Sequence, residues 1–357
     1  MKKIFVGMSG GVDSSTTAAL LKEQGKDVTG VYMKNWTKDI AGNKCPWRED
    51  LADAQSVAAR LDIPLEIFDF QDQYRQKVVD YMIAEYEAGR TPNPDIMCNQ
   101  EIKFKLFLDT ALEAGAEMIA TGHYARIVDI SEEGEEVKGL YAGVDESKDQ
   151  SYFLYRMPPE ALYKTLFPLG DMNKSQVRKM AKKLKLPNAS KADSQGICFV
   201  GEVDIKDFLR EHIDVKPGPI KNMEGKILGE HEGAQLYTIG QRQGLGVGGG
   251  LPLYVVSKNI ATNTIYVTDN LNTLMSGEIK LDNLHWLNQA PEVGDQYMVR
   301  TRHLGKLTEA EVVDITENTL TLKLSEPERA VTAGQSAVLY KEDNNGKRVV
   351  GGGIITI

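Results

Sequence analysis

The sequence predicts an α/β protein in which a doubly wound parallel sheet is followed by a small β-rich unit and a C-terminal β-barrel. In the first part of the chain, β-rich segments alternate with segments of helical periodicity, which is typical of a parallel sheet covered by helices on both faces. After about residue 215, short strands alternate with Gly, Asn and Asp turns, which is typical of small barrels. Together these two patterns predict the fold class.

The elements of the first unit follow from the residue pattern in chain order. Strands are predicted for "KKIFVGMS" at 2–9, "DVTGVYM" at 27–33, "LEIFDF" at 65–70 and "MIATGH" at 118–123. Helices are predicted at 14–25, 48–64, 72–88, 102–115 and 173–187. Within 48–64, the residues that recur at helical spacing are Leu51, Ala54, Val57, Ala58 and Leu61. Two of the helices are expected to end at Gly25 and Gly115.

Length and composition indicate a soluble protein of several domains. A chain of 357 residues is too long for one ordinary hydrophobic core. We expect one domain at 1–209, a small β-rich domain at 210–275 and a barrel at 276–357. No apolar run approaches the roughly 20 residues that cross a bilayer, and the short apolar N-terminus has no cleavage site. The sequence therefore predicts a cytoplasmic protein without a membrane partner, and we expect a monomer.

The net charge of −9 restricts how the protein can bind nucleic acid. Its average surface repels phosphate, so a nucleic-acid face would need locally concentrated basic residues. Seven basic residues and no acidic residue occur between positions 174 and 191, namely Lys174, Arg178, Lys179, Lys182, Lys183, Lys185 and Lys191. This run is a candidate phosphate-binding face, and a merely solvated helix face is the alternative.

The three cysteines, Cys45, Cys98 and Cys198, do not form a structural or metal-binding pattern. Their odd number argues against a disulfide framework, and the absence of Cys-x-x-Cys argues against zinc and iron–sulfur sites. Cys98 follows a Pro-rich loop and precedes a helix expected near Asn99, a position that lowers a thiol pKa. Cys198 lies in a polar, Gly-containing loop. Buried, inert thiols are the alternative for both, and we interpret Cys45 as structural.

The stretch "VGMSGGVDSS" at 6–15 joins the first predicted strand to the first predicted helix. Adjacent glycines allow a tight bend that presents several N–H groups to one anion, and the helix start favours negative charge. The loop lacks the Walker lysine and the Rossmann glycine spacing. It therefore suits a leaving pyrophosphate, with Asp13 helping to place Mg²⁺, and indicates ATP-dependent adenylation. An ordinary strand–helix turn is the alternative.

"SGGVDSS" is similar to the motif of the ATP-pyrophosphatase (PP-loop) superfamily. With "GRTPNPDIMCN", "IATGHYAR", "KDQSYFL", "DSQGICF", "TIGQRQGLG" and "VTAGQSAV", the chain resembles the tRNA-specific 2-thiouridylase family over nearly its whole length. The resemblance implies a sulfurtransferase that uses ATP and Mg²⁺ to adenylate C2 of the wobble uridine in a tRNA anticodon loop. Sulfur from a cysteine persulfide then replaces the oxygen, and AMP and pyrophosphate are released. It also implies a persulfide-donating partner protein.

The resemblance also implies roles for individual residues. Cys98 would be the attacking or resolving cysteine, and Cys198 would carry the sulfur as a persulfide. A disulfide would join the two cysteines, and Asp95 would act as general acid or base. The ATP-binding residues would be Gly7, Met8, Ser9, Gly10, Gly11, Val12, Asp13, Ser14, Met33 and Gly122. The target base would meet Asn93, Pro94 and Asp95. The other tRNA contacts would be His123, Lys148, Asp149, Gln150, Arg302, His303 and Gln335.

Two other classes of function compete with this interpretation. A PP-loop synthetase or amidotransferase would adenylate a small metabolite and would need no cysteine pair. A non-catalytic RNA-binding protein would keep the loop without using ATP. For a thiolating enzyme, direct attack by the Cys198 persulfide and hydrosulfide release by Cys98 both stay open, as do the accepted tRNAs and the sulfur donor.

Overall fold

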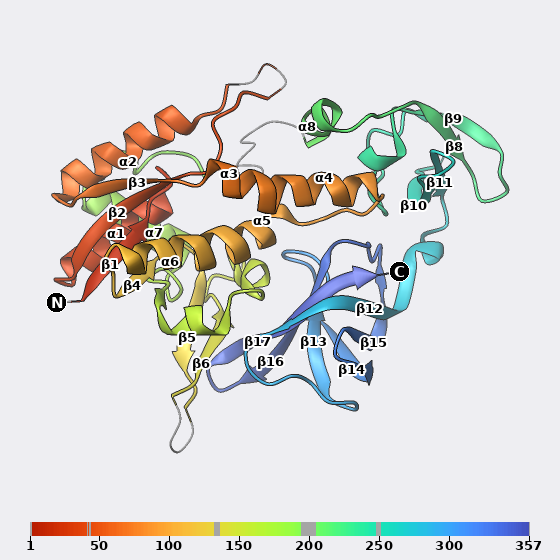
Figure 1. The fold of residues 1–357 in the computed structure, drawn as a ribbon. Helices are drawn as coiled ribbons and strands as arrows, with labels where there is room; N and C mark the ends of the chain where they lie inside the picture. Colours follow the sequence, from red (N-terminus) through yellow and green to blue (C-terminus); the bar gives the residue numbers. More distant parts are fainter. Residues whose placement is uncertain are drawn as a thin grey trace.

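The protein is built around three β-sheets, and helices surround the first of them (Figure 1). The computed structural model describes residues 2–40, 42, 44–131, 136–193, 205–247 and 251–356. Within these residues the strands form a five-stranded, a four-stranded and an eight-stranded sheet. The predicted fold class, a parallel α/β unit followed by a small β-rich unit and a barrel, is confirmed. None of the helices in these ranges is long and apolar enough to span a membrane.

The first sheet is parallel throughout, with strand order β3-β2-β1-β4-β7. Its strands are β1 (Lys3–Gly7), β2 (Asp27–Lys34), β3 (Leu65–Asp69), β4 (Met118–Ala120) and β7 (Thr165–Leu166). In β1, Ile4 and Val6 enter one core and Phe5 enters another, because side chains alternate between the faces of a sheet. Val6 pairs with Ala120, so β1 and β4 end side by side.

Helices cover both faces of the parallel sheet, as the alternating pattern predicts (Figure 1). Those before β4 are α1 (Val12–Glu23), α2 (Trp47–Leu61), α3 (Gln71–Tyr74), η1 (Arg75–Val79), α4 (Asp80–Glu87), α5 (Pro94–Met97), η2 (Cys98–Leu106) and α6 (Phe107–Glu113). Those that follow are η3 (Ser151–Leu154), η4 (Pro159–Tyr163), α7 (Lys174–Lys183) and α8 (Ile205–His212). The helix predicted at 72–88 is therefore confirmed, with a π-helical middle.

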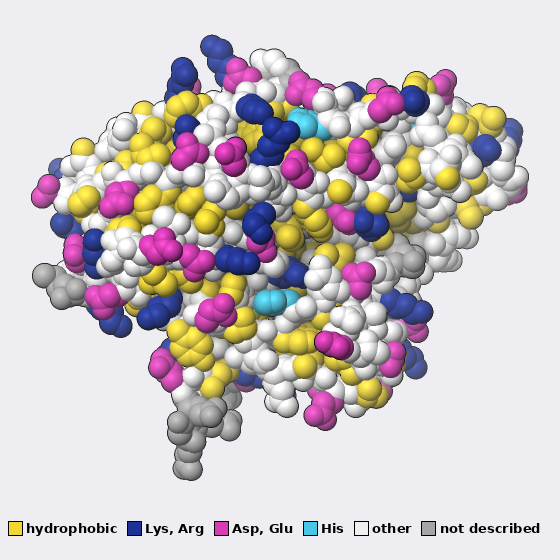
Figure 2. Space-filling view, viewed as in Figure 1, with side chains coloured by type: hydrophobic (Ala, Val, Ile, Leu, Met, Phe, Trp, Pro, Cys, Tyr) yellow, Lys and Arg dark blue, Asp and Glu magenta, His cyan; other side chains and the backbone are white. Residues whose placement is uncertain are grey.

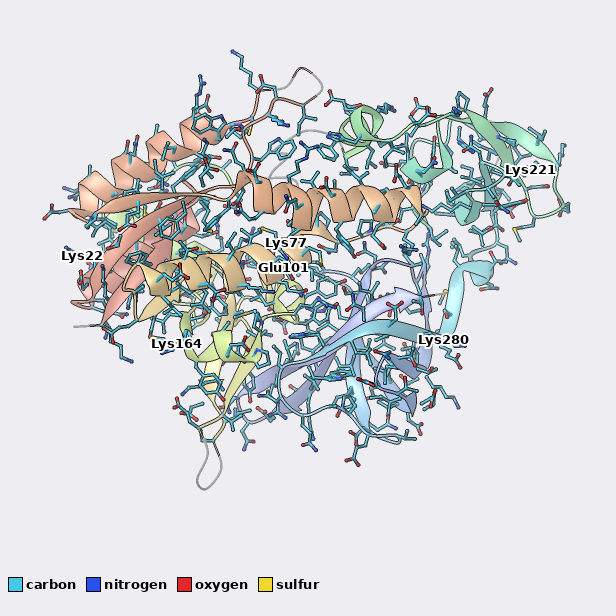
Figure 3. All side chains as sticks on the ribbon, viewed as in Figure 1. Lys22, Lys77, Glu101, Lys164, Lys221 and Lys280 are labelled. Atoms are coloured by element: carbon cyan, nitrogen blue, oxygen red, sulfur yellow. The ribbon has the colours of Figure 1, made fainter. Side chains whose placement is uncertain are left out.

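The two faces of the sheet have separate cores. Ala18 of α1 and Val57 of α2 pack with Ile4, whereas Met82 of α4 and Phe107 of α6 pack with Phe5. On the second face the two long helices α3-η1-α4 and α5-η2-α6 run side by side (Figure 1). An ion pair of 2.9 Å between Lys77 and Glu101 joins them (Figure 3).

The small β-rich unit is a four-stranded sheet with order β10-β11-β8-β9. Its strands are β8 (Gly218–Lys221), β9 (Ile227–His231), β10 (Tyr254–Asn259) and β11 (Thr264–Thr268). Two short 3₁₀ helices, η5 (Ala234–Leu236) and η6 (Leu271–Leu274), belong to the same part of the chain. This unit lies beside the end of α4 and above the barrel in Figure 1.

The C-terminal unit is a six-stranded antiparallel barrel closed by pairing of β12 with β17. Its strands are β12 (Met275–Trp286), β13 (Gln296–Arg300), β14 (Thr308–Ile315), β15 (Thr319–Arg329), β16 (Ser336–Asp343) and β17 (Gly346–Thr356). Alternating side chains such as Ile279, Leu281, Val312 and Leu322 fill its interior. The turn-rich sequence predicted a barrel here, and the structure has one.

A hairpin from the first unit extends the barrel sheet. β5 (Ala125–Asp129) and β6 (Lys138–Ala142) pair with each other, and β6 also pairs with β17 through Tyr141–Arg348 and Leu140–Val349. The sequence analysis did not predict this hairpin. The eight-stranded sheet therefore contains strands from both expected domains, 1–209 and 276–357. The expected domain boundaries stay a prediction.

Candidate active site

The loop between β1 and α1 has the tight backbone that its sequence predicts. Gly10 has φ of +75°, and a Cβ atom there would lie 2.4 Å from the backbone oxygen of Asp50. The positive φ and the close backbone oxygen of Asp50 therefore both exclude a side chain at Gly10. Gly11 caps α1 in an extended conformation, and α1 begins at Val12. The loop thus lies at the carboxyl end of a central strand and at a helix N-terminus, where ligands and anions bind in parallel α/β proteins.

Hydroxyl groups and one buried amide hold this loop in place. Ser9 donates its backbone N–H to Ser14 Oγ at 3.1 Å, and the Ser15 hydroxyl donates to Gly11 O at 2.8 Å. The buried Asn188 side chain donates to Gly10 O at 2.8 Å and to Ser15 Oγ at 2.9 Å. Asn188 was not singled out from the sequence, because nothing local connects it to a loop that lies far away in the chain.

Gly122 and Met33, two of the residues expected to bind ATP, lie against the loop. A Cβ at Gly122 would lie 2.8 Å from the backbone of Asp13 and Ser14, so the chain after β4 passes directly over the start of α1. Met33 Cε lies 3.1 Å from the position of a Cβ at Gly7. The side chains of Met8 and Val12 are buried in the core, and the Met8 N–H donates to Val31 O at 2.8 Å, so their expected part in ATP binding stays a prediction.

The carboxylate of Asp13 is already paired. Lys174 Nζ lies 2.8 Å from both of its oxygens, and the Tyr124 hydroxyl donates to Oδ1 at 2.9 Å. Lys174 also pairs with Asp193 at 2.8 Å. Burial raises the pKa of Asp193, but hydrogen bonds from Lys174 and Lys148 outweigh it and leave the pKa at about 2. The loop therefore has a nearby lysine after all, supplied by α7.

This pairing bears on the expectation that Asp13 helps to place Mg²⁺, which stays a prediction. A metal ion would have to displace Lys174 from the Asp13 carboxylate. Elsewhere in the described part of the chain, no three His, Cys, Asp or Glu side chains gather as a metal site.

The predicted low pKa of Cys98 is wrong. The helix begins at Pro94, with Asn93 as its N-cap accepting from the Ile96 N–H at 3.4 Å, so Cys98 lies one turn inside it. Its side chain is 1% exposed. Burial raises the pKa of the Cys98 thiol and Asp95 raises it further, while Lys103 and a hydrogen bond with Tyr74 lower it. Cys98 is therefore a protonated thiol in this state.

Three buried polar atoms around Cys98 have no hydrogen-bond partner among the described residues, namely Asp95 Oδ1, Asn99 Oδ1 and His303 Nδ1. Burial lowers the pKa of His303, and the charge of Asp95 opposes this, so the two groups interact across the boundary between the first unit and the barrel. The His303 ring packs on Phe153 with centroids 4.3 Å apart, and Asn99 donates to Phe153 O at 3.2 Å. The barrel loop thus reaches the Cys98 loop.

The side chain of Asp149, one of the residues expected to contact tRNA, is buried rather than presented to solvent, and the contact itself stays a prediction. This side chain is 3% exposed and accepts hydrogen bonds from the N–H of Gly143, from the N–H and hydroxyl of Ser151, and from Arg300 at 3.0 Å. The neighbouring Tyr152 hydroxyl donates to Ser336 O at 2.9 Å. Asp149 is therefore part of a buried seam between the first unit and the barrel.

The other residues expected to contact tRNA differ in accessibility. Lys148 pairs with Asp193 at 2.9 Å, and Gln150 Oε1 accepts from the Tyr124 N–H at 3.0 Å. Gln335 donates to the backbone of Thr91 at 2.7 Å. All three are partly exposed, and Arg302 is exposed. Their contacts with tRNA stay predictions.

His123 is buried rather than presented on the surface. Its ring packs between Phe104 and Phe167, and Nδ1 lies 2.7 Å from Thr121 Oγ1. Burial and the nearby charge of Lys103 lower its pKa well below the usual range. His123 is therefore neutral, and this position fits a packing role beside Gly122 better than contact with RNA.

The remaining cysteines add little to the site. Cys198 lies outside the described residues, so its expected role and its pairing with Cys98 stay predictions. Cys45 is half-buried, its thiol donates to Trp36 O at 3.6 Å, and burial raises its pKa. These contacts agree with the structural interpretation of Cys45.

The basic run at 174–191 is only partly a free basic face. Lys174 and Arg178 pair with Asp193, and Lys191 pairs with Asp50 and Asp53. The exposed members that form no ion pair within the described ranges are Lys179, Lys182, Lys183 and Lys185. On the face drawn in Figure 2, basic and acidic side chains are interspersed, so no broad basic field faces the viewer.

Neutralising Lys179, Lys182 and Lys183 together with glutamine is expected to weaken tRNA binding and flatten its salt dependence. Each phosphate contact contributes roughly 0.7–0.9 to the slope of log K against log salt, so three contacts would remove about 2 units. The control replaces Lys2, Lys22 and Lys26, three exposed lysines outside the basic run, which lie before β1, at the end of α1 and before β2, with Lys22 labelled in Figure 3. Equal slopes for both variants in a filter-binding titration would place the RNA face elsewhere.

Replacing Asp13 with alanine is expected to abolish ATP-dependent adenylation while tRNA affinity stays close to that of the unmodified protein. The reason is local: Lys174 loses its two 2.8 Å contacts and shifts toward Asp193, which disturbs the phosphate loop. Lys174→Met should reproduce the loss, and Asp53→Ala, which removes a contact with Lys191, should not. Pyrophosphate release and filter binding measure the two properties. A parallel loss of tRNA binding would contradict this assignment.

Comparisons with known proteins cover the whole chain. The "tRNA methyl transferase HUP domain" family matches residues 2–202, the "tRNA methyl transferase PRC-barrel domain" matches 206–269 and the "Aminomethyltransferase beta-barrel domain" matches 276–355. Among solved structures, NMN synthetase from Francisella tularensis is 17% identical with a TM-score of 0.34, covering 54% of this chain and 66% of that one. That likeness is too low to support an argument.

Curated relatives are much closer to this chain. The tRNA-specific 2-thiouridylase MnmA of Ralstonia pickettii is 47% identical over 99% of this chain and 96% of its own length. The protein of the same name from Nitrosomonas eutropha is 45% identical over 99% of this chain and 98% of its own. Since both likenesses extend through all three units, from the phosphate loop to the last barrel strand, the chain belongs to the tRNA-specific 2-thiouridylase family.

Proposed function

We propose that this protein is a tRNA-uridine 2-sulfurtransferase that replaces the C2 oxygen of a wobble uridine with sulfur. ATP is the co-substrate, and AMP and pyrophosphate are the other products. The observation that carries the proposal is a chain of contacts between the two predicted centres. Phe104, on the same helical segment as Cys98, packs against His123 with ring centroids 5.6 Å apart, and Gly122 lies against the start of α1. These contacts support a single site for the thiol and the ATP loop, as adenylation followed by sulfur transfer requires.

Adenylation needs the ATP phosphates to be held so that the uracil C2 oxygen can attack the α-phosphate. The N–H groups at the start of α1 and the amine of Lys174 would hold the ATP phosphates, and this fits a loop whose glycines leave no room for side chains. The uracil C2 oxygen then attacks the α-phosphate and forms a C2–O–AMP ester, and pyrophosphate leaves. Mg²⁺ would accompany ATP as part of the substrate.

The base would lie between the Asp95 loop and the barrel. Among the described residues, Asp95 Oδ1 and His303 Nδ1 are buried polar atoms without partners, and such groups are uncommon unless a ligand completes them. Uracil N3–H is a donor that could satisfy one of them. An anticodon base is already unpaired, so inserting it costs less than extracting a base from a duplex.

Sulfur transfer requires two thiols with different tasks. A persulfide on Cys198 attacks C2, and AMP leaves with the original oxygen. Cys98 then attacks the Cys198 sulfur, so 2-thiouridine is released and the two cysteines form a disulfide that an external thiol reduces. Since Cys98 is protonated in this state, its proton must first leave, and Asp95, which lies three residues earlier, is the proposed acceptor.

Mass spectrometry of tRNA after incubation with the protein, ATP, Mg²⁺ and a persulfide donor tests the proposal. We expect one oxygen of the wobble uridine to be replaced by sulfur, and nucleotide analysis should find AMP rather than ADP. ADP as the product of tRNA-stimulated turnover would overturn the mechanism. The metabolite-adenylating synthetase gains no support from the comparisons, because the full-length relatives are 2-thiouridylases by name.

A further inference from the structure

A cavity of about 590 Å³ lies where the three units meet, apart from the candidate active site. The first unit contributes Gly89 and Thr91, the small β-rich unit contributes residues of β10, and the barrel contributes the start of β12 and the loop at 331–333. Small-molecule sites have volumes of roughly 300–1,000 Å³ and occur preferentially at domain interfaces. The size and the location of this cavity are therefore those of a binding site.

The cavity has an apolar wall, hydroxyl groups and one inner amine. Its apolar side chains include Val256, Leu274, Ile279 and Val331, and Thr91 and Thr332 add hydroxyl groups. The amine belongs to Lys258 on β10. Glu278 and Lys280, the other charged groups of the lining, have side chains that are more than half exposed, and they pair with each other at 3.9 Å.

Lys258 lacks a counter-ion among the residues that the structure describes. Its Nζ donates to Tyr237 O at 2.6 Å, and no carboxylate in those residues forms an ion pair with it. Burial lowers the pKa of this amine to about 8, so a large fraction stays charged near neutral pH. A desolvated charge is costly unless an opposite charge accompanies it. An anion bound in the cavity would supply the opposite charge that this amine lacks there.

We propose that this cavity binds a small organic anion with an apolar body, whose anionic group, a carboxylate or a phosphate monoester, takes Lys258 as its counter-ion. The apolar body packs on Val256 and Ile279, and the threonine hydroxyls meet its polar edge. This proposal does not depend on the proposed function.

Occupation of the cavity would act on the loop that leads to the active site. Thr91 accepts at its backbone oxygen from Gln335 at 2.7 Å, donates its N–H to Ala333 O at 2.9 Å, and its hydroxyl lies 3.3 Å from that of Thr238. Thr91, a residue of the first unit, thus contacts both of the other units and lies two positions before Asn93. A ligand against Thr91 fixes the relative placement of the units and the start of the Asp95 loop.

The test uses the full chain and the fluorescent probe 8-anilino-1-naphthalenesulfonate, which has an aromatic body and one anionic group. Lys258→Met, which keeps the length of the side chain, is expected to weaken binding by about tenfold or more. The matched control Lys280→Met removes an exposed amine of the same cavity and should change affinity by about twofold at most. Equal effects of the two substitutions would overturn the proposal.

A second measurement needs no variant and so does not depend on how Lys258→Met folds. Reductive methylation of the unmodified protein, read by peptide mass spectrometry, should be slowed by the probe at Lys258 and not at Lys280. Benzoate and phenyl phosphate, added separately, distinguish the carboxylate from the phosphate ester by which of them displaces the probe. Absence of protection at Lys258, or displacement by neutral benzyl alcohol as effective as by either anion, would contradict the proposal.

Discussion

Cys98→Ser is expected to stop repeated thiolation of tRNA. Serine has nearly the same size and fits the buried position, but it cannot open a cysteine persulfide or close a disulfide. We expect the multiple-turnover rate to fall by about 10³-fold or more, as is usual when a nucleophile is removed. Adenylation should persist, because the phosphate loop is unchanged. Chromatography with mass spectrometry of digested tRNA measures the first property, and pyrophosphate release measures the second.

The same variant tests the pairing of the two thiols. After one turnover without reductant, peptide mapping of the unmodified protein should find a Cys98–Cys198 disulfide that is missing in Cys98→Ser. The matched control is Cys45→Ser, which should keep both the disulfide and the rate. Because burial raises the pKa of Cys98, its thiolate fraction grows as pH rises, and disulfide formation should accelerate above neutral pH. Wild-type turnover by Cys98→Ser would return Cys98 to a packing role.

Asp149→Ala is expected to cause the largest loss of stability of any single change in the seam. It leaves Arg300 buried without its carboxylate, and breaking a buried ion pair in this way typically costs about 3–5 kcal/mol. The His303 loop follows Arg300 directly, so tRNA affinity should fall as well. Urea unfolding gives the free energy of unfolding, and filter binding gives the tRNA affinity.

An exposed ion pair between the same two units provides the control. Lys347 pairs with Glu146 at 2.8 Å, and the Glu146 side chain is 83% exposed. Lys347→Ala should lower the free energy of unfolding by less than about 1 kcal/mol. If Asp149→Ala were as mild as Lys347→Ala, the seam would not depend on the buried pair. If tRNA affinity fell without loss of stability, the direct contact first expected for Asp149 would regain support.

The elements that the sequence predicted correctly depend on local signals. Alternating strands and helices in the first third of the chain, the loop glycines and the turn-rich barrel are all encoded within short windows. The start of the helix before Cys98 was misplaced although its signal is present. Asn93 followed by Pro94 is the usual pairing of an N-cap with a first helical residue, and it places Cys98 one turn inside the helix.

The features that the sequence did not reveal all depend on partners that are far apart in the chain. Lys174 reaches Asp13 across 161 residues, and Arg300 reaches Asp149 across 151. No periodicity connects such pairs, so Lys174 was assigned only to a basic face and Asp149 to RNA. Whether a side chain is exposed also depends on residues far away in the chain. A polar residue in a loop-like sequence becomes buried only when another unit covers it.

The hairpin β5–β6 has a consequence for synthesis on the ribosome. β6 pairs on its other side with β17, the last strand among the described residues, and Tyr141 donates to Asp343, 202 residues later. At about 5–20 residues per second, the edge of β6 would stay uncovered for roughly 10–40 s after it emerges. An unpaired strand edge attracts other strands. The nascent chain therefore carries an open pairing edge until β17 has been made, and we expect truncated products that lack β17 to aggregate where products that contain it stay dispersed.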